Sequence, residues 1–144
     1  MKKLKGYIFS RNFIDERIPQ HIQNTILRDY CRNNNYEFFL SVVEYSMQNS
    51  FLMLESLVHQ LNNYDGILAY SLFQLPEKES ERKKIIKKIV NNKKEIHFAL
   101  ENKILKNIND YEDINNIWLI KKTLIKNKEF YEDEKTKKFF KFTT

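Results

Sequence analysis

The 144-residue chain has the length of one domain, and 42% of its residues are hydrophobic, which suffices for a core and excludes global disorder. Its net charge of +6 lies in the second half: residues 1–77 hold 7 Lys and Arg against 8 Asp and Glu, whereas residues 78–144 hold 18 against 11. The excess is mostly lysine, so we attribute it to composition rather than to a nucleic-acid surface, and we do not expect DNA as a partner.

Cys31 is the only cysteine, which excludes an intrachain disulfide and a cysteine-based metal cluster. The three histidines lack the spacing of metal ligands, so no metal is predicted. With two glycines, the chain has no glycine-rich phosphate loop and no dinucleotide fingerprint, so no cofactor is predicted. No apolar run approaches the roughly 18 residues of a membrane span, and residues 1–10 lack the apolar core of a signal peptide. We therefore expect a cytoplasmic protein without membrane insertion.

Short apolar segments alternate with amphipathic segments along the first half of the chain. Leu4 to Phe9 is apolar and predicts a strand, which a polar loop follows. Pro19 suits the first turn of a helix, whose apolar positions recur at helical spacing as far as Cys31. Residues 36–43 (YEFFLSVV) predict a second strand, and after a polar stretch residues 54–61 predict a second helix.

The same alternation continues in the second half. Residues 67–72 (ILAYSL) are apolar enough for a central strand, and Ile85 to Val90 mark a third helix. Residues 95–100 (EIHFAL) predict a fourth strand, and after a polar link residues 114–125 have the periodicity of a fourth helix. Residues 127–144 are mostly charged, and they form either a final helix or a flexible tail.

This alternating order is typical of an α/β protein with right-handed crossovers between parallel strands. We predict one three-layer α/β domain over residues 1–126, with residues 127–144 outside it. The domain has a parallel four-stranded sheet in the order 2-1-3-4, flanked by helices on both faces. The first and third strands are the most apolar, which places them at the centre.

Ligands of open parallel sheets bind at the carboxyl ends of the strands, where the strand order reverses. We therefore expect a cleft between residues 10–17 and residues 71–76. The helix at Pro19 has no Ser, Thr, Asp or Asn directly before it, so its free N–H groups are available to an anion. The polar residues around this helix start are candidates for the same site: Arg11, Arg17, Gln20 and His21. The alternative is a helix that a more distant side chain or water caps.

Carboxylates and hydroxyls also follow the predicted strands. Glu44 and Glu101 are candidate general acids or bases. Ser10 is a candidate nucleophile, with His21 as the nearby base. Five further side chains are predicted to bind the substrate: Tyr45, Tyr70, Ser71, Gln74 and Asn102. The alternatives are carboxylates that are exposed to water and a serine that only hydrogen-bonds the backbone.

Three of these segments resemble the N-terminal catalytic domain of serine recombinases, or resolvases. GYIFS at Gly6–Ser10 is similar to their first strand, which ends in the nucleophilic serine. IQNTILRDYC at Ile22–Cys31 and DGILAYSLFQLP at Asp65–Pro76 fall where that family has its first helix and its catalytic turn. The resemblance covers about residues 4–104 and implies a resolvase-like or flavodoxin-like fold.

The catalytic pattern of the recombinases is absent. Ile8 and Phe9 stand where that family has an arginine before the serine, and apolar and amide residues around Phe73 and Gln74 replace its Asp-Arg pair. Without these arginines nothing clamps a DNA phosphate. We therefore expect the recombinase fold without its activity.

A closer resemblance is to a small bacterial family, the sporadic carbohydrate cluster proteins. It covers about residues 5–125 and is carried by GYIFSRNF at Gly6–Phe13, RIPQHIQNTILRDYC at Arg17–Cys31, VEYSMQNSFLML at Val43–Leu54, DGILAYSLFQLP at Asp65–Pro76 and EIHFALEN at Glu95–Asn102. The resemblance implies a role in gene clusters for bacterial surface glycans. It supplies no catalytic residues.

Three hypotheses follow. The first is an enzyme of surface-carbohydrate biosynthesis that binds a phosphorylated sugar, a nucleotide sugar or a similar anionic metabolite. The second is a non-catalytic partner or regulatory subunit of another glycan-cluster enzyme, and the third is a DNA-binding relative of the recombinases. We also expect a homo-oligomer, because self-association would cover Trp118 and the aromatic residues near the C-terminus.

Overall fold

A computed structural model describes the backbone of residues 1–143 and the side chains of residues 1–128. The chain divides into two compact units, Met1–Tyr111 and Glu112–Thr144. The first unit contains the sheet. The second unit consists of the helix that begins at the boundary between the two.

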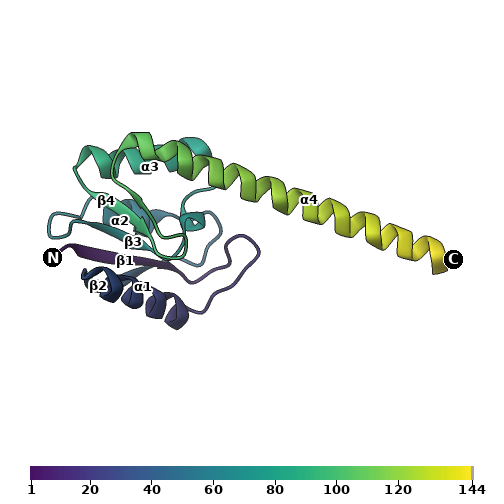
Figure 1. Ribbon diagram of the computed structural model, residues 1–144, viewed down its shortest axis with the longest axis horizontal. Coiled ribbons are helices and arrows are strands. Elements are labelled where there is room, and N and C mark those ends of the chain that lie inside the picture. Colours follow the sequence, from purple (N-terminus) through teal and green to yellow (C-terminus); the bar gives the residue numbers. More distant parts are fainter. Residues whose placement is uncertain (144) are drawn as a thin grey trace. The chain divides into compact units, whose positions relative to one another are not determined.

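The first unit contains one five-stranded sheet in the order β2-β1-β3-β4-β5 (Figure 1). The first four strands pair in parallel, which confirms the predicted order 2-1-3-4, and β5 pairs antiparallel with β4. The strands are β1 (Lys3–Phe9), β2 (Glu37–Glu44), β3 (Gly66–Ala69), β4 (Glu95–Phe98) and β5 (Lys103–Leu105).

The fifth strand was not predicted, because its residues belong to the segment interpreted as a polar link. Strand β5 has three residues, and only Leu105 is buried. The chain reverses after β4 through Asn102, whose backbone has a φ of 52°. So short an edge strand with one buried side chain has no period-two pattern for the sequence to reveal.

Helices cover both faces of the sheet, as predicted (Figure 1). Leu27, Tyr30 and Cys31 of α1 pack against Leu4 and other apolar side chains of β1 and β3 on one face. The second and third helices cover the other face. The helices of the first unit are α1 (Gln20–Asn34), α2 (Leu52–Val58) and α3 (Glu79–Asn91), with 3-10 turns η1 (Leu72–Gln74) and η2 (Ile108–Asp110).

The central strands approach each other closely at Gly66. A Cβ atom at this position would lie 2.2 Å from the backbone oxygen of Glu95 on the neighbouring strand. Only glycine fits this backbone approach, because real Cβ atoms do not come so close to a carbonyl oxygen.

Helix α4 (Tyr111–Thr143) supplies the second unit. It begins three residues before the predicted helix and ends at Thr143. The aromatic residues near its end, Phe139, Phe140 and Phe142, lie outside the described side chains. Among the described residues, no helix has the length and apolarity that a membrane crossing needs.

Candidate functional site

A pocket opens at the carboxyl edge of the sheet, where the sequence predicts a cleft. It has a volume of about 280 Å³ and lies within the first unit. Three segments form it: the loop after β1, the loop before α2 and the segment after β3. We call it the arginine pocket, and its lining consists of Phe9, Arg11, Asn12, Phe13, Ile14, Asp15, Gln48, Asn49, Phe51, Phe73, Leu75 and Glu77.

Arg11 is the cationic side chain of this pocket, and its neighbours hold it in place. Its guanidinium carbon lies 4.2 Å from the centre of the Phe9 ring and 5.0 Å from that of Phe51. One terminal nitrogen donates a hydrogen bond of 2.8 Å to the backbone oxygen of Tyr45. A guanidinium has five N–H groups, so most of them are left for a ligand. The arginine is therefore oriented before any ligand binds.

The loop after β1 contains a strained turn that lines the same pocket. Phe13 and Glu16 exchange two backbone hydrogen bonds, of 3.0 and 3.1 Å. The two residues between them, Ile14 and Asp15, have φ values of 51° and 58°. Positive φ is unfavourable for a β-branched residue such as isoleucine, and strain of this kind clusters at functional sites.

Glu44 is not placed as a free acid or base. Its side chain is buried, and its oxygens accept hydrogen bonds from the backbone N–H groups that begin α2, those of Met53 (3.1 Å) and Leu54 (3.2 Å). They also accept from the hydroxyl of Tyr7 at 2.9 Å, from the N–H of Tyr45 at 3.0 Å and from the hydroxyl of Ser50 at 3.3 Å. The carboxylate joins the end of β2 to the start of α2.

Glu101 has a similar role at η1. One carboxylate oxygen accepts from the N–H of Leu72 at 2.7 Å, and the other accepts from the hydroxyl of Ser71 at 2.8 Å. Burial raises the pKa of Glu101, and these hydrogen bonds oppose the rise without cancelling it. Glu101 and Ser71 thus lie together, but neither lines the arginine pocket.

A buried pair of glutamines joins α1 to the end of β3. The Nε2 of Gln74 donates to the Oε1 of Gln23 at 2.8 Å. Gln23 also bonds both the N–H and the C=O of Phe9, and Gln74 accepts from the N–H of Tyr70 at 3.1 Å. Gln74 therefore belongs to the frame of the site. Gln23 was not among the predicted site residues, although a glutamine on the apolar side of a helix is a signal of a buried polar role.

The other predicted residues surround this edge without meeting in one pocket. The hydroxyl of Ser10 donates to the backbone oxygen of Glu44 at 3.1 Å, and the buried ring of Tyr70 packs edge-on against Phe13. The remaining side chains are exposed: Arg17, Gln20, His21, Tyr45 and Asn102. Of the twelve predicted site residues, Arg11 is the one that lines the arginine pocket.

The carboxylates that do line the arginine pocket are Asp15 and Glu77, which were not among the predicted site residues. Asp15 comes after β1, and Glu77 comes after β3. Like Glu44 and Glu101, both therefore lie beyond the carboxyl end of a strand, where ligands of parallel sheets bind. Among the described residues, no group of three or more His, Cys, Asp or Glu side chains is arranged to hold a metal.

The fold belongs to the α/β class with a mostly parallel sheet, and it is similar to that of the resolvases. One similar solved structure is the N-terminal catalytic domain of TP901-1 integrase, with a TM-score of 0.60 and 15% identity over 90% of this chain and 97% of that one. Another is a resolvase family site-specific recombinase from Streptococcus pneumoniae, with a TM-score of 0.58 and 9% identity over 94% of this chain and 99% of that one.

At these identities the similarity shows the fold alone. No family model matches the chain, and no curated protein matches it. The recombinase-like fold expected from the sequence is thus supported. The resemblance to the sporadic carbohydrate cluster proteins stays a prediction.

Proposed function

We propose that this chain binds a phosphorylated or acidic sugar in the arginine pocket, as a protein of bacterial surface-carbohydrate biosynthesis. The observation that carries the proposal is the fixed guanidinium of Arg11, held by two aromatic rings and one carbonyl beside an open pocket. Phosphates and carboxylates are the groups that an oriented guanidinium recognises through paired hydrogen bonds.

The rest of the lining suits a polyhydroxylated ligand. Asn12, Gln48 and Asn49 offer amides, which both donate and accept, while Asp15 and Glu77 accept from hydroxyls. Phe13 and Phe73 add apolar walls for the ring of a sugar. Asp15 and Glu77 are also the carboxylates that would carry acid–base chemistry, because the oxygens of Glu44 and Glu101 are used within the protein.

The test is a titration of the purified chain with sugar 1-phosphates and uronic acids, after a thermal-shift screen that selects the ones that bind. The Arg11→Ala variant is expected to weaken binding by about 10- to 150-fold, the range for a lost charged hydrogen bond. Arg17→Ala is the matched control, because this arginine lies in the same loop, is exposed and does not line the pocket. No binding by any of these ligands, or equal losses in both variants, would refute the proposal.

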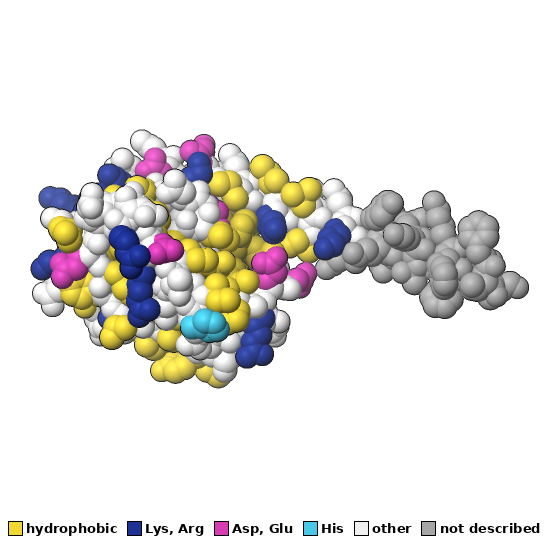
Figure 2. Space-filling model, turned by 60° about the horizontal axis from the view of Figure 1, so that its bottom comes forward, with side chains coloured by type: hydrophobic (Ala, Val, Ile, Leu, Met, Phe, Trp, Pro, Cys, Tyr) yellow, Lys and Arg dark blue, Asp and Glu magenta, His cyan; other side chains and the backbone are white. Residues whose placement is uncertain are grey.

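Site-specific recombination is a second candidate, favoured by the fold and by the position of Ser10 directly after β1. Two observations weigh against it. The Ser10 hydroxyl donates to the backbone of Glu44, and the face in Figure 2 has scattered Lys and Arg side chains rather than one basic patch. Tight binding to duplex DNA at physiological salt, with a steep salt dependence, would favour this candidate over the first.

A further inference from the structure

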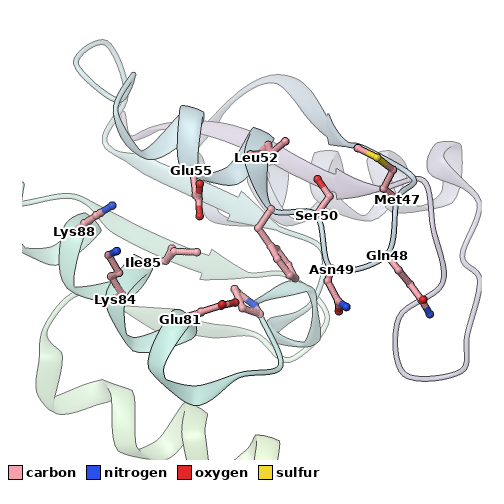
Figure 3. Close-up of a pocket in the computed structure, with 12 residues that line it drawn as sticks. Met47, Gln48, Asn49, Ser50, Leu52, Glu55, Glu81, Lys84, Ile85 and Lys88 are labelled. Carbon is pink, nitrogen blue, oxygen red and sulfur yellow. The ribbon is translucent and has the colours of Figure 1, made fainter.

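A second and larger pocket adjoins the arginine pocket. It has a volume of about 510 Å³ and lies between α2, α3 and the loop before α2 (Figure 3). We call it the helix pocket, and its lining consists of Met47, Gln48, Asn49, Ser50, Phe51, Leu52, Glu55, Pro76, Glu81, Lys84, Ile85 and Lys88. Gln48, Asn49 and Phe51 line both pockets and form the wall that they share.

Two lysines of α3 provide positive charge at one end of the helix pocket. Lys84 and Lys88 are four residues apart on the helix, so their side chains lie on the same face, and Figure 3 shows both amines directed to the same end. Neither forms an ion pair with a described residue, although Glu55 and Glu81 line the same pocket. Like charges at this spacing are mildly destabilising in a free helix, so folding does not require the pair.

The other walls of the helix pocket are apolar or carry hydrogen-bonding groups. Met47 and Leu52 are more than half exposed although both are apolar, and Phe51 presents an aromatic ring. A flat heteroaromatic ring is the kind of group that such walls accept, since bases stack on aromatic side chains. Across the pocket from the lysines, Glu55 offers a carboxylate that can accept from the hydroxyls of a ribose.

We propose that the helix pocket binds a nucleoside phosphate, with its phosphate at Lys84 and Lys88 and its base against Phe51. This nucleotide site is separate from the proposed sugar site, because the base, and not the phosphate, lies at the wall shared with the arginine pocket. The chain then has adjoining pockets for a nucleotide and for an anionic sugar. A sugar phosphate alone leaves the helix pocket empty.

The experiment measures binding of two kinds of probe to the full chain by calorimetry: the four ribonucleoside diphosphates, and sugar 1-phosphates. The test variant is Lys84→Gln with Lys88→Gln. The matched control is Lys87→Gln, an exposed lysine of the same helix that does not line the pocket. At least one nucleoside diphosphate is expected to bind, with a loss of about tenfold or more in the double variant and none in the control.

Arg11→Ala separates this inference from the proposed function. Loss of sugar-phosphate binding in Arg11→Ala, with nucleoside diphosphate binding lost only in the lysine variant, supports both. Sugar-phosphate binding without any nucleoside diphosphate binding overturns the inference and leaves the proposed function standing. If a nucleoside diphosphate binds through the lysines and no sugar phosphate binds, the proposed function is refuted and the inference stands. Equal nucleoside diphosphate binding by the lysine variant and its control also overturns the inference.

Discussion

The Nε2 atom of Gln74 donates a hydrogen bond of 2.8 Å to the Oε1 atom of Gln23, and both side chains are almost fully buried. This bond joins the first helix to the turn after β3, across the carboxyl edge of the sheet. Gln23 in turn bonds both backbone groups of Phe9, at the end of β1. The pair therefore fixes the two segments between which the arginine pocket opens.

Replacing Gln23 with Met is expected to lower the free energy of unfolding by about 2–4 kcal/mol, because it leaves several buried polar groups without partners. Urea denaturation measures the loss. Gln20 lies on the same helix and is exposed, so Gln20→Met should change the free energy of unfolding little. In the double variant with Gln74→Met the losses should fall short of additive, since each single change already breaks the shared bond. Additive losses would show that the two glutamines act independently.

The sheet order was predictable because each central strand is a compact apolar run between polar segments, and the crossover rule leaves few ways to arrange four such strands. The position of the cleft followed from that order. The roles of the polar residues could not be predicted from the strand order. That order shows which residues lie at the carboxyl edge of the sheet, but not which way their side chains point. Glu44 turns inward to cap α2, whereas Asp15 reaches the pocket only through the left-handed turn at Ile14.

Glu44→Gln is expected to destabilise the protein rather than to remove a catalytic base. The amide that replaces the carboxylate has one acceptor oxygen, whereas Glu44 now accepts from five donors, among them the N–H groups of Met53 and Leu54. A loss of about 2–4 kcal/mol in the free energy of unfolding is expected. Glu55→Gln on the exposed side of α2 is the control. A variant as stable as the wild type would contradict the capping role.

Gly66→Ala is expected to cost about 1–3 kcal/mol or more, because the new Cβ would lie 2.2 Å from the backbone oxygen of Glu95, which cannot move without disturbing the sheet. Gly6→Ala provides a comparison. Its shortest contact, also 2.2 Å, is to the side-chain hydroxyl of Ser41. Adding Ser41→Ala to Gly6→Ala should therefore recover part of the stability that Gly6→Ala loses. Thermal melts compare Gly66→Ala, Gly6→Ala and the double variant. Full tolerance of Gly66→Ala would contradict the close approach of β3 and β4.

A chain of polar side chains lies at the start of β4, and two of its members, His97 and Tyr30, are buried. The Nε2 of His97 is 2.5 Å from a carboxylate oxygen of Glu95, and its Nδ1 is 2.6 Å from the hydroxyl of Tyr30. Lys2 forms an ion pair with Glu95 at 3.0 Å. A neutral imidazole satisfies both contacts, by donating from Nε2 to Glu95 and accepting at Nδ1 from Tyr30. Burial lowers the pKa of His97 below its ordinary value of 6.5, and the nearby Glu95 opposes this without reversing it.

This shift predicts that the protein loses stability as the pH falls below neutrality. The folded state keeps His97 neutral at a pH where the unfolded chain already binds a proton, so unfolding takes up a proton between the folded pKa and 6.5. The stabilisation is complete above 6.5 and is lost as the pH falls towards the folded pKa. Urea denaturation between about pH 7.5 and about pH 5.5 should show this decline.

The variant His97→Gln should flatten that pH dependence, even though losing the two buried contacts lowers its stability at every pH. His21→Asn alters an exposed histidine and should keep the wild-type slope. An NMR titration measures the pKa of His97 directly, and it should lie below 6.5. If His97 instead titrates above 6.5, its pair with Glu95 outweighs burial, and acid should then stabilise the protein over that range.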